Sequence, residues 1–261
     1  MFNFLVQADT TYRGLFHWFN WFGYSSSVFI RPAVFIIMYS ILGRFSGSPE
    51  MIRHYAIGVA TYSMAVIVLP AISACYVNDR FGGTLAFFFA SPANRFVSFM
   101  ARTVFHFPNA PLSFMAALFM AWIVADLDFN SVNWVGFIVA ALITAASVTA
   151  FGALVANFAI VFRDWTITQA IPVGMILVLS GVIIPLTVFS EPIQEFARLL
   201  PVTNGLIAIR STFGGSPLSE ASGYILREGI SGLIYFMIGF AGFTLFEGVS
   251  KRRGTLELET S

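Results

Sequence analysis

Residues that could carry ATP chemistry are scarce in this sequence. Its 261 residues include a single lysine, Lys251, which lies in a Lys-Arg-Arg-Gly run near the C-terminus. A phosphate-binding P-loop needs the pattern Gly-x-x-x-x-Gly-Lys-Ser/Thr. The sequence therefore predicts no ordinary ATPase site in this chain, and any ATP-driven work must come from another chain.

Metal, acid–base and thiol chemistry also lack a motif. Asp126 and Asp128 form an acidic turn, but carboxylates two residues apart need not converge, and solvation explains them. Cys75, the one cysteine, cannot form an internal disulfide and is interpreted as a small packing residue. The three histidines lack the spacing of metal ligands: His17, His54 and His106. An integral-membrane enzyme is therefore a weakly supported function class.

The composition indicates a membrane protein. Of the residues, 57% are hydrophobic and 10% are charged, and the mean hydropathy is +0.81. A soluble domain carries about 25% charged residues, and a soluble globule could not hide so much apolar surface. The sequence therefore predicts an all-α polytopic membrane protein. The formal net charge of +1 gives nucleic-acid binding no electrostatic support.

Sparse charges mark the limits of the apolar spans. A helix needs about 20 apolar residues to cross the hydrocarbon core, and the interval between Arg53 and Asp79 exceeds that length. The interval between Asp128 and Arg163 is longer, but it is too short for two crossings. We expect six transmembrane helices, near residues 26–45, 55–77, 97–124, 134–162, 170–190 and 229–248.

Basic residues near the ends of the spans predict the orientation. With both termini in the cytoplasm, nine basic residues lie on the cytoplasmic side and five on the outer side. Residues 1–8 lack the basic region of a cleavable signal peptide, so we expect the first span to be retained. The expected organisation is an N-terminal interfacial segment over 1–25, a membrane domain over 26–250 and a cytoplasmic tail over 251–261.

The N-terminal residues 9–24 favour an amphipathic helix at the membrane interface. Aromatic residues gather on one helical face, whereas Arg13, His17 and Asn20 lie on the opposite face. Helices of this kind lie in the interface rather than crossing it. The alternative is that these residues form the leading turns of the first span, but their polar groups would be costly in lipid.

A second segment too short to cross the membrane covers residues 78–95, on the predicted cytoplasmic side. Only 14 residues separate Arg80 from Arg95, and the pairs Gly82-Gly83 and Ser91-Pro92 punctuate its two ends. A short apolar helix between charges suits docking against a soluble partner. An interfacial loop that merely joins two spans explains the same composition, so both interpretations stay open at this point.

Residues 191–216 follow the fifth expected span on the predicted outer side. Pro201 divides them into two apolar pieces of roughly ten residues, each about half of a crossing. We expect a re-entrant helical hairpin that dips into the outer leaflet. Its tip, at Thr203 and Asn204, is expected to be accessible to reagents added outside.

Three runs of residues appear in a fixed order along these segments. The first comprises Asp79, Gly83-Thr84-Leu85, Ser91-Pro92 and Arg95; the second covers 152–164; the third covers 180–185, 200–205 and 208–210. Together they resemble the membrane subunit of type-2 ATP-binding-cassette exporters, a permease family that includes antibiotic-resistance, nodulation-factor and polysaccharide exporters. The family usually has Glu at the position of Asp79 and a more charged helix after Leu85.

The resemblance implies a permease that pairs with a second copy of itself and with two cytoplasmic ABC ATPase chains. It also implies the cytoplasmic (inner) membrane of a prokaryote, with ATP and Mg bound by the ATPase and no cofactor or metal in this chain. ATPase coupling would fall to Asp79, Gly83, Thr84, Leu85, Ser91, Pro92 and Arg95. The outer hairpin would be marked by Pro201, Asn204 and Arg210.

The expected function is export of an amphipathic compound, such as a drug-like molecule or a secondary metabolite. Export of a lipid-linked polysaccharide or another glycan is the alternative, because aromatic residues can line either path. A different class is the ion-coupled secondary transporter, which keeps an ionisable residue near the bilayer midplane and often has inverted repeats. The full charges within the expected spans, Arg31 and Arg102 among them, lie near the ends of those spans, and we find no such repeat.

Overall fold

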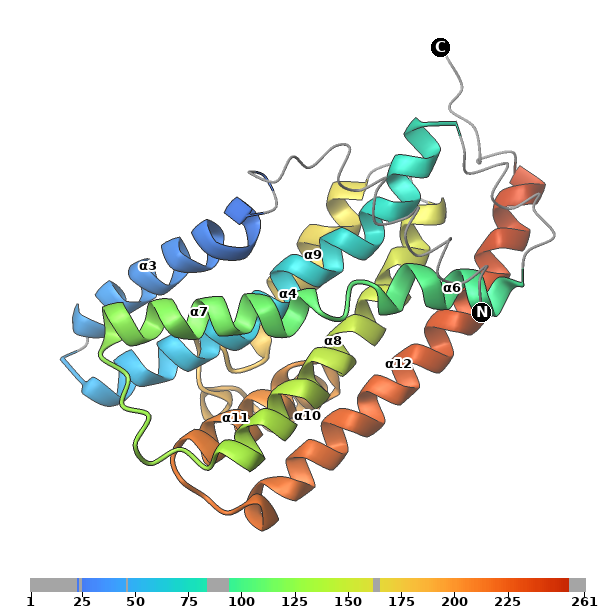
Figure 1. The fold of residues 1–261 in the computed structure, drawn as a ribbon. Coiled ribbons are helices and arrows are strands. Elements are labelled where there is room, and N and C mark those ends of the chain that lie inside the picture. Colours follow the sequence, from blue (N-terminus) through green and yellow to red (C-terminus); the bar gives the residue numbers. More distant parts are fainter. Residues whose placement is uncertain (1–22, 24, 46, 84–93, 162–164, 254–261) are drawn as a thin grey trace.

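The computed structural model describes residues 23, 25–45, 47–83, 94–161 and 165–253. Within these residues the chain is helical, and neighbouring helices are joined by short turns (Figure 1). The helical elements, in chain order, are η1 (Ser26–Ile30), α3 (Arg31–Phe45), α4 (Pro49–Phe81), α6 (Arg95–Val104), α7 (Asn109–Ala125), α8 (Trp134–Val161), α9 (Trp165–Leu179), η2 (Leu186–Val188), α10 (Glu191–Leu199), α11 (Thr203–Phe213) and α12 (Leu218–Arg253).

Five of the expected spans correspond to helical segments that are long and apolar enough to cross a membrane. They are Ser26–Phe45, Pro49–Asp79, Phe96–Ala125, Trp134–Ala159 and Leu218–Leu245. The multi-pass helical architecture expected from composition is therefore confirmed. The N-terminal interfacial helix falls on residues 1–22, which lie outside the described residues.

The third expected span, 97–124, is divided into two helices. Helix α6 ends at Val104 and α7 begins at Asn109. Pro108 lies between them, and a proline lacks an N–H and disfavours helical backbone in the residue before it. Turn hydrogen bonds fill the break, including those from His106 N to Thr103 O and from Phe107 N to Val104 O, both 3.1 Å.

The fifth expected span was wrong as a continuous helix over 170–190. Helix α9 runs from Trp165 to Leu179, and its apolar part, Gln169–Leu179, is shorter than a crossing. It ends because Gly181 has a left-handed φ of 78°, which glycine adopts without a steric cost. The chain then continues through η2 into α10 and α11, which lie on either side of Pro201.

The start of the last helix also differs from the expectation of 229. Helix α12 begins at Leu218 and is continuous through Arg227 and Glu228, which the sequence had suggested as loop residues. At about 1.5 Å per residue it is longer than the hydrocarbon core needs, as is α4. Polar residues near helix ends therefore mark a span boundary poorly.

The interface between α8 and α12 is built on small residues. A Cβ placed on Gly232 would come within 2.9 Å of Ser147 Cα, and one on Gly239 within 3.2 Å of Leu154 N. The Asn157 side chain donates to the Gly239 carbonyl at 2.7 Å. Small residues let helix backbones approach closely, and interhelical polar groups add to the packing of membrane helices.

The two ends of the bundle are made of different segments (Figure 1). At one end lie the turns after α3 and α7 and before α12, and the Asn133 side chain joins the last two by donating to Ser216 O at 3.0 Å. At the other end lie the end of α4, the start of α6 and the end of α12. The end of α4 and the start of α6, which flank the expected coupling residues, therefore lie at the same end of the bundle as the end of α12.

Candidate functional site

The residues expected to couple to an ATPase lie between α4 and α6. Asp79 is in the last turns of α4, Gly83 follows that helix, and Arg95 is the first residue of α6. Four of the expected residues lie outside the described residues: Thr84, Leu85, Ser91 and Pro92. The structure therefore defines the two flanks of this stretch.

Gly83 has a conformational role. Its φ is 67°, a left-handed value typical of glycine just after a helix. A Cβ built on Gly83 would meet no atom of the described residues within 4 Å. The sequence suggested either a turn or a close backbone approach at this position, and the geometry favours the turn.

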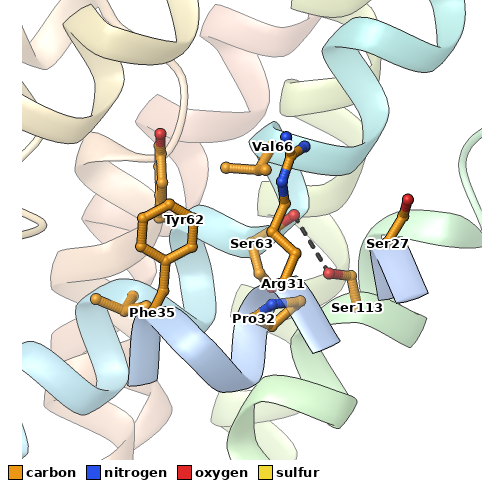
Figure 2. A pocket seen from close by; sticks show the side chains of 9 residues that line it. Ser27, Arg31, Pro32, Phe35, Tyr62, Ser63, Val66 and Ser113 are labelled. Carbon is orange, nitrogen blue, oxygen red and sulfur yellow. Dashed lines mark hydrogen bonds between the residues drawn. The ribbon is translucent and has the colours of Figure 1, made fainter. Parts of the chain in front are cut away.

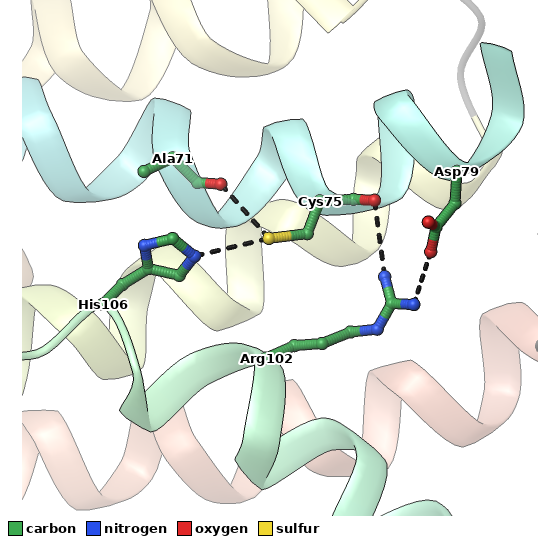
Figure 3. Close-up of polar contacts among 5 residues, drawn as sticks. All are labelled: Ala71, Cys75, Asp79, Arg102 and His106. Atoms are coloured by element: carbon green, nitrogen blue, oxygen red, sulfur yellow. Dashed lines mark hydrogen bonds and ion pairs between the residues drawn. The ribbon is translucent and has the colours of Figure 1, made fainter. Parts of the chain in front are cut away.

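A partly buried ion pair joins α4 to α6 directly before this turn (Figure 3). Arg102 Nη2 donates to Asp79 Oδ2, and Arg102 Nη1 lies 3.4 Å from the Cys75 carbonyl oxygen. The Arg102 side chain is 8% exposed and that of Asp79 is 27% exposed. Charge-assisted bonds of this kind are among the stronger ones in proteins. Asp79 thus fixes the end of α4 against α6.

The aromatic ring of Tyr76 completes the surroundings of Arg102. The guanidinium carbon lies 4.9 Å from the ring centroid, an arrangement that attracts a cation to the ring face. Tyr76 is itself buried and contacts Phe243 of α12, with ring centroids 6.2 Å apart. The ion pair is therefore packed into the core that α4, α6 and α12 share.

Cys75 and His106 extend this cluster toward the break between α6 and α7. The Cys75 Sγ lies 3.3 Å from His106 Nε2 and 3.4 Å from the Ala71 carbonyl oxygen. Both side chains are buried, which agrees with a packing role for Cys75. Among the described residues, no three His, Cys, Asp or Glu side chains gather in a way that could hold a metal ion.

The start of α6 is fixed by a local cap. The Asn94 side-chain oxygen accepts from Phe96 N at 2.9 Å and from Val97 N at 3.3 Å. An asparagine at this position satisfies backbone donors that have no partner within the helix. The Asp79–Arg102 pair thus ties the α4 flank of the 84–93 stretch to α6, and the Asn94 cap fixes where α6 begins.

The hairpin residues Pro201 and Asn204 are buried, and the expected exposed tip was wrong. Thr203 is 0% exposed and Asn204 is 2% exposed. The Asn204 side chain donates to the Arg198 carbonyl at 2.8 Å and so satisfies the end of α10. The packing reason is Gly205, whose Cβ would come within 2.0 Å of Thr144 Oγ1, so α11 lies directly against α8.

Arg210 binds the broken end of α9 to the start of α4. Its Nη1 donates to Gly181 O at 2.9 Å, and its Nη2 donates to His54 O at 2.8 Å and Val182 O at 3.2 Å. The Gly181 and Val182 carbonyls need a donor because these two residues are not helical, and the bond to His54 O joins them to α4. Burial lowers the pKa of Arg210 to about 9, which still leaves the guanidinium charged at neutral pH.

Glu228 is a site residue that the sequence interpretation missed. It lies within α12, is 0% exposed, and accepts from Val202 N at 2.9 Å and Gly205 N at 3.0 Å. The carboxylate thereby holds the first turn of α11, where negative charge is favourable, and steadies Val202 at its strained φ of 80°. The sequence feature that could have placed Glu228 in a helix is the absence of proline between Leu218 and Glu228, which permits one unbroken helix.

Arg31, which the sequence placed inside the first span, lies on a narrow pocket between α3, α4 and α7 (Figure 2). Figure 2 shows its guanidinium directed along α4 past Val66. Below it, Ser113 Oγ donates to the Ser63 carbonyl at 3.3 Å. The pocket volume of about 10 Å³ admits at most one water, so this is not a substrate cavity.

The comparisons with known proteins identify the family. Residues 10–214 match the ABC-2 type transporter family, and this range covers well over half of the chain. The search of curated proteins gave no match. The match covers α3 to α11 and includes both the Asp79–Arg102 pair and the hairpin. The chain belongs to the ABC-2 type transporter family, as a multi-pass membrane permease subunit that works with an ATPase subunit and is not itself a catalytic domain.

Proposed function

We propose that the chain is the permease subunit of an ATP-driven exporter, with an amphipathic compound as its substrate. The observation that carries this proposal is the family match over residues 10–214 together with the two fixed flanks of the 84–93 stretch. The functional unit is two copies of this chain and two copies of an ATPase that binds ATP and Mg. The lysine count supports a separate ATPase.

Residues 79–95 would receive the movement of the ATPase. Asp79 belongs to α4 and is paired with Arg102 of α6, so a displacement of the stretch between them acts on both helices at once. Helix α4 contacts α3, α7, α8 and α9, and a rigid shift of α4 would therefore move most of the bundle. This is the physical basis for assigning coupling to Asp79, Gly83, Thr84, Leu85, Ser91, Pro92 and Arg95.

The orientation that suits this role has both termini in the cytoplasm. The end of α4, the start of α6 and the end of α12 lie at one end of the bundle, and the turns after α7 and before α12 lie at the other (Figure 1). A reporter fused after Arg253 should then be cytoplasmic, and one inserted within 126–133 should be external. Reporters on the same side would overturn this arrangement in the inner membrane.

The transport test uses inside-out membrane vesicles that contain this chain and its co-expressed ATPase. A panel of fluorescent amphipathic dyes and a lipid-linked oligosaccharide serve as probes, and ATP-dependent entry into the vesicles is measured. The proposal expects dye entry that stops when the P-loop lysine of the ATPase is replaced. Entry of the oligosaccharide alone would favour glycan export, and entry of neither probe would contradict both substrate classes.

The coupling test compares two glycines with the same backbone conformation. Gly83 and Gly47 have φ values of 67° and 70°, and a Cβ on either would meet no described atom within 4 Å. They lie at opposite ends of the bundle, so Gly47→Trp is the matched control for Gly83→Trp. Gly83→Trp and Leu85→Asp should remain inserted, lose transport and bind the ATPase more weakly in co-purification. Full ATPase binding and transport in both variants would make the coupling assignment wrong.

Ion-coupled transport is a second candidate because of Glu228. A carboxylate buried in a membrane-spanning helix is the feature that this class requires. However, both carboxylate oxygens of Glu228 already accept from backbone N–H groups of α11. Transport that continues without the ATPase and collapses when an ionophore dissipates the proton gradient would favour this candidate over the exporter.

A further inference from the structure

A cavity of about 540 Å³ opens at the end of the bundle opposite the coupling stretch. Its walls come from the end of α3, the start of α4, the turn after α7 and the end of α11. The volume is within the range of small-molecule and headgroup sites. Four charged side chains line it, two of each sign: Arg44, Arg53, Asp126 and Asp128.

The charged side chains that line this cavity each have their own neighbours. Within the part of the chain that the structure describes, no ion pair joins any of them. Arg44 donates one Nη2 bond to Val124 O at 3.0 Å, and Arg53 stacks over the Phe213 ring at 4.9 Å. Asp128 accepts from Asn130 N at 2.9 Å. Each contact fixes a charged group and leaves it capacity for a ligand.

The charged side chains of this cavity lie at the ends of the candidate spans, where lipid headgroups are expected. Arg44 is next to the last residue of the first span, Asp126 directly follows the third, and Arg53 lies in the first turns of the second. Large apolar side chains beside it are open to the surroundings, with Phe45 85% and Trp134 51% exposed. Aromatic residues at such positions are typical of the membrane–water interface.

We propose that this cavity binds the headgroup of a zwitterionic phospholipid, one that presents a phosphate and an ammonium group. The guanidinium groups of Arg44 and Arg53 would hold the phosphate, for which their planar donors are suited. The carboxylates of Asp126 and Asp128 would hold the ammonium. The acyl chains would lie along the exposed apolar surface that includes Phe45.

The charge balance selects this class over the alternatives. An anionic headgroup would satisfy the arginines and place its remaining polar surface against two carboxylates. A simple cation would satisfy the two carboxylates and leave the two arginines facing a like charge. Only a ligand with both signs offers an opposite charge to all four side chains, and like charges brought together oppose binding.

The test is native mass spectrometry of the purified, detergent-solubilised protein. Phosphatidylethanolamine and phosphatidylglycerol with identical acyl chains are titrated separately, and glycerophosphoethanolamine serves as the free headgroup. We expect phosphatidylethanolamine to bind more tightly than phosphatidylglycerol. Arg53→Gln should weaken its binding by roughly tenfold, which corresponds to the loss of one charge-assisted contact.

Asp126→Asn is the second variant and is chosen to preserve the fold. Asp126 has a φ of 49°, a conformation that asparagine also accepts. Asp126→Asn should weaken the binding of phosphatidylethanolamine and reduce the preference for this lipid over phosphatidylglycerol. The controls are Glu195→Gln and Arg198→Gln, whose side chains pair with each other at 3.4 Å on the hairpin and do not line the cavity. Their binding should equal that of the wild type.

Three results would overturn the proposal. They are equal or tighter binding of phosphatidylglycerol, unchanged lipid binding in both cavity variants, and binding of glycerophosphoethanolamine as tight as that of the lipid. The last result would assign the cavity to a soluble ligand. None of these results depends on transport, so the proposal can fail while the exporter assignment stands.

Discussion

Two regions of this permease bury charged side chains in different ways. In the corner between α4 and α6, Arg102 pairs with another side chain, that of Asp79. At the hairpin, Arg210 of α11 and Glu228 of the neighbouring α12 are held by backbone groups, three carbonyls for the first and two N–H groups for the second. The corner is therefore a contact between two side chains, whereas the hairpin is held at the ends of its broken helices.

The two regions differ in whether a second substitution can recover the stability that a first one removes. When two buried side chains are partners, both can be replaced by apolar groups and the desolvation cost disappears with them. When the partner is the backbone, no substitution removes it, and a lost side chain leaves an unsatisfied N–H or C=O in a low-dielectric environment. The predictions below test this contrast.

The largest effect is expected in the corner. Asp79→Leu leaves the Arg102 guanidinium buried without its carboxylate and should cost about 3 kcal/mol of unfolding free energy. Adding Arg102→Met should recover most of that loss. Denaturant titration in detergent micelles gives the double-mutant cycle. Costs that simply add would show that the two side chains do not stabilise each other.

The next effect is expected at Glu228. Glu228→Gln turns an amide N–H₂ toward one of the backbone donors of Val202 and Gly205, and an unsatisfied buried donor costs about 1–3 kcal/mol. Glu220→Gln, at an exposed position in the first turn of the same helix, should change stability by less than about 0.5 kcal/mol. The same titration measures both variants. Equal stabilities would contradict the capping role.

Packing of the hairpin on α8 gives a smaller effect. Gly205→Ala places a Cβ within 2.0 Å of Thr144 Oγ1 and should cost about 1–2 kcal/mol as α11 moves away. Thr144→Ala removes that oxygen, so the double variant should be more stable than Gly205→Ala alone. Thermal unfolding followed by intrinsic fluorescence is the measurement. No recovery in the double variant would mean that another contact limits the approach.

The smallest effect is expected at Gly83. Gly83→Ala should cost about 1 kcal/mol because its φ is left-handed, and Gly83→Asn should cost less because asparagine accepts that region. Gly174→Ala, in the interior of α9 with open space around it, should instead be neutral or stabilising. Thermal unfolding shows whether each variant is less stable or more stable than the wild type. A loss at Gly174 as large as that at Gly83 would contradict the conformational explanation.

The sequence predicted the helical membrane fold because hydropathy acts locally. Runs such as 134–162 contain enough apolar residues to cross a bilayer whatever surrounds them, and α8 covers nearly the same range. The limits of the last span were less predictable. Arg227 and Glu228 resemble loop residues when only charge is counted, but Glu228 is stable within a helix because α11 supplies its hydrogen bonds.

The candidate site was predictable to the extent that its residues have local roles. Pro201 dividing two short helices and Gly83 ending α4 follow from backbone chemistry, and each lies where that chemistry requires. The partners of Asp79 and Arg210 were not predictable. Asp79 meets Arg102 from 23 residues away, and Arg210 reaches His54 from 156 residues away. Contacts between residues so far apart in the sequence depend on how the helices pack.

Composition and hydropathy were enough to establish that this protein spans a membrane and where its main apolar helices lie. These properties follow from composition and from where the apolar residues lie. Only the tertiary structure decided that α9 ends at Leu179, that Asn204 is buried and that Glu228 holds the start of α11. The physical reason is that a broken helix is stable in a membrane only when distant side chains satisfy its free backbone groups.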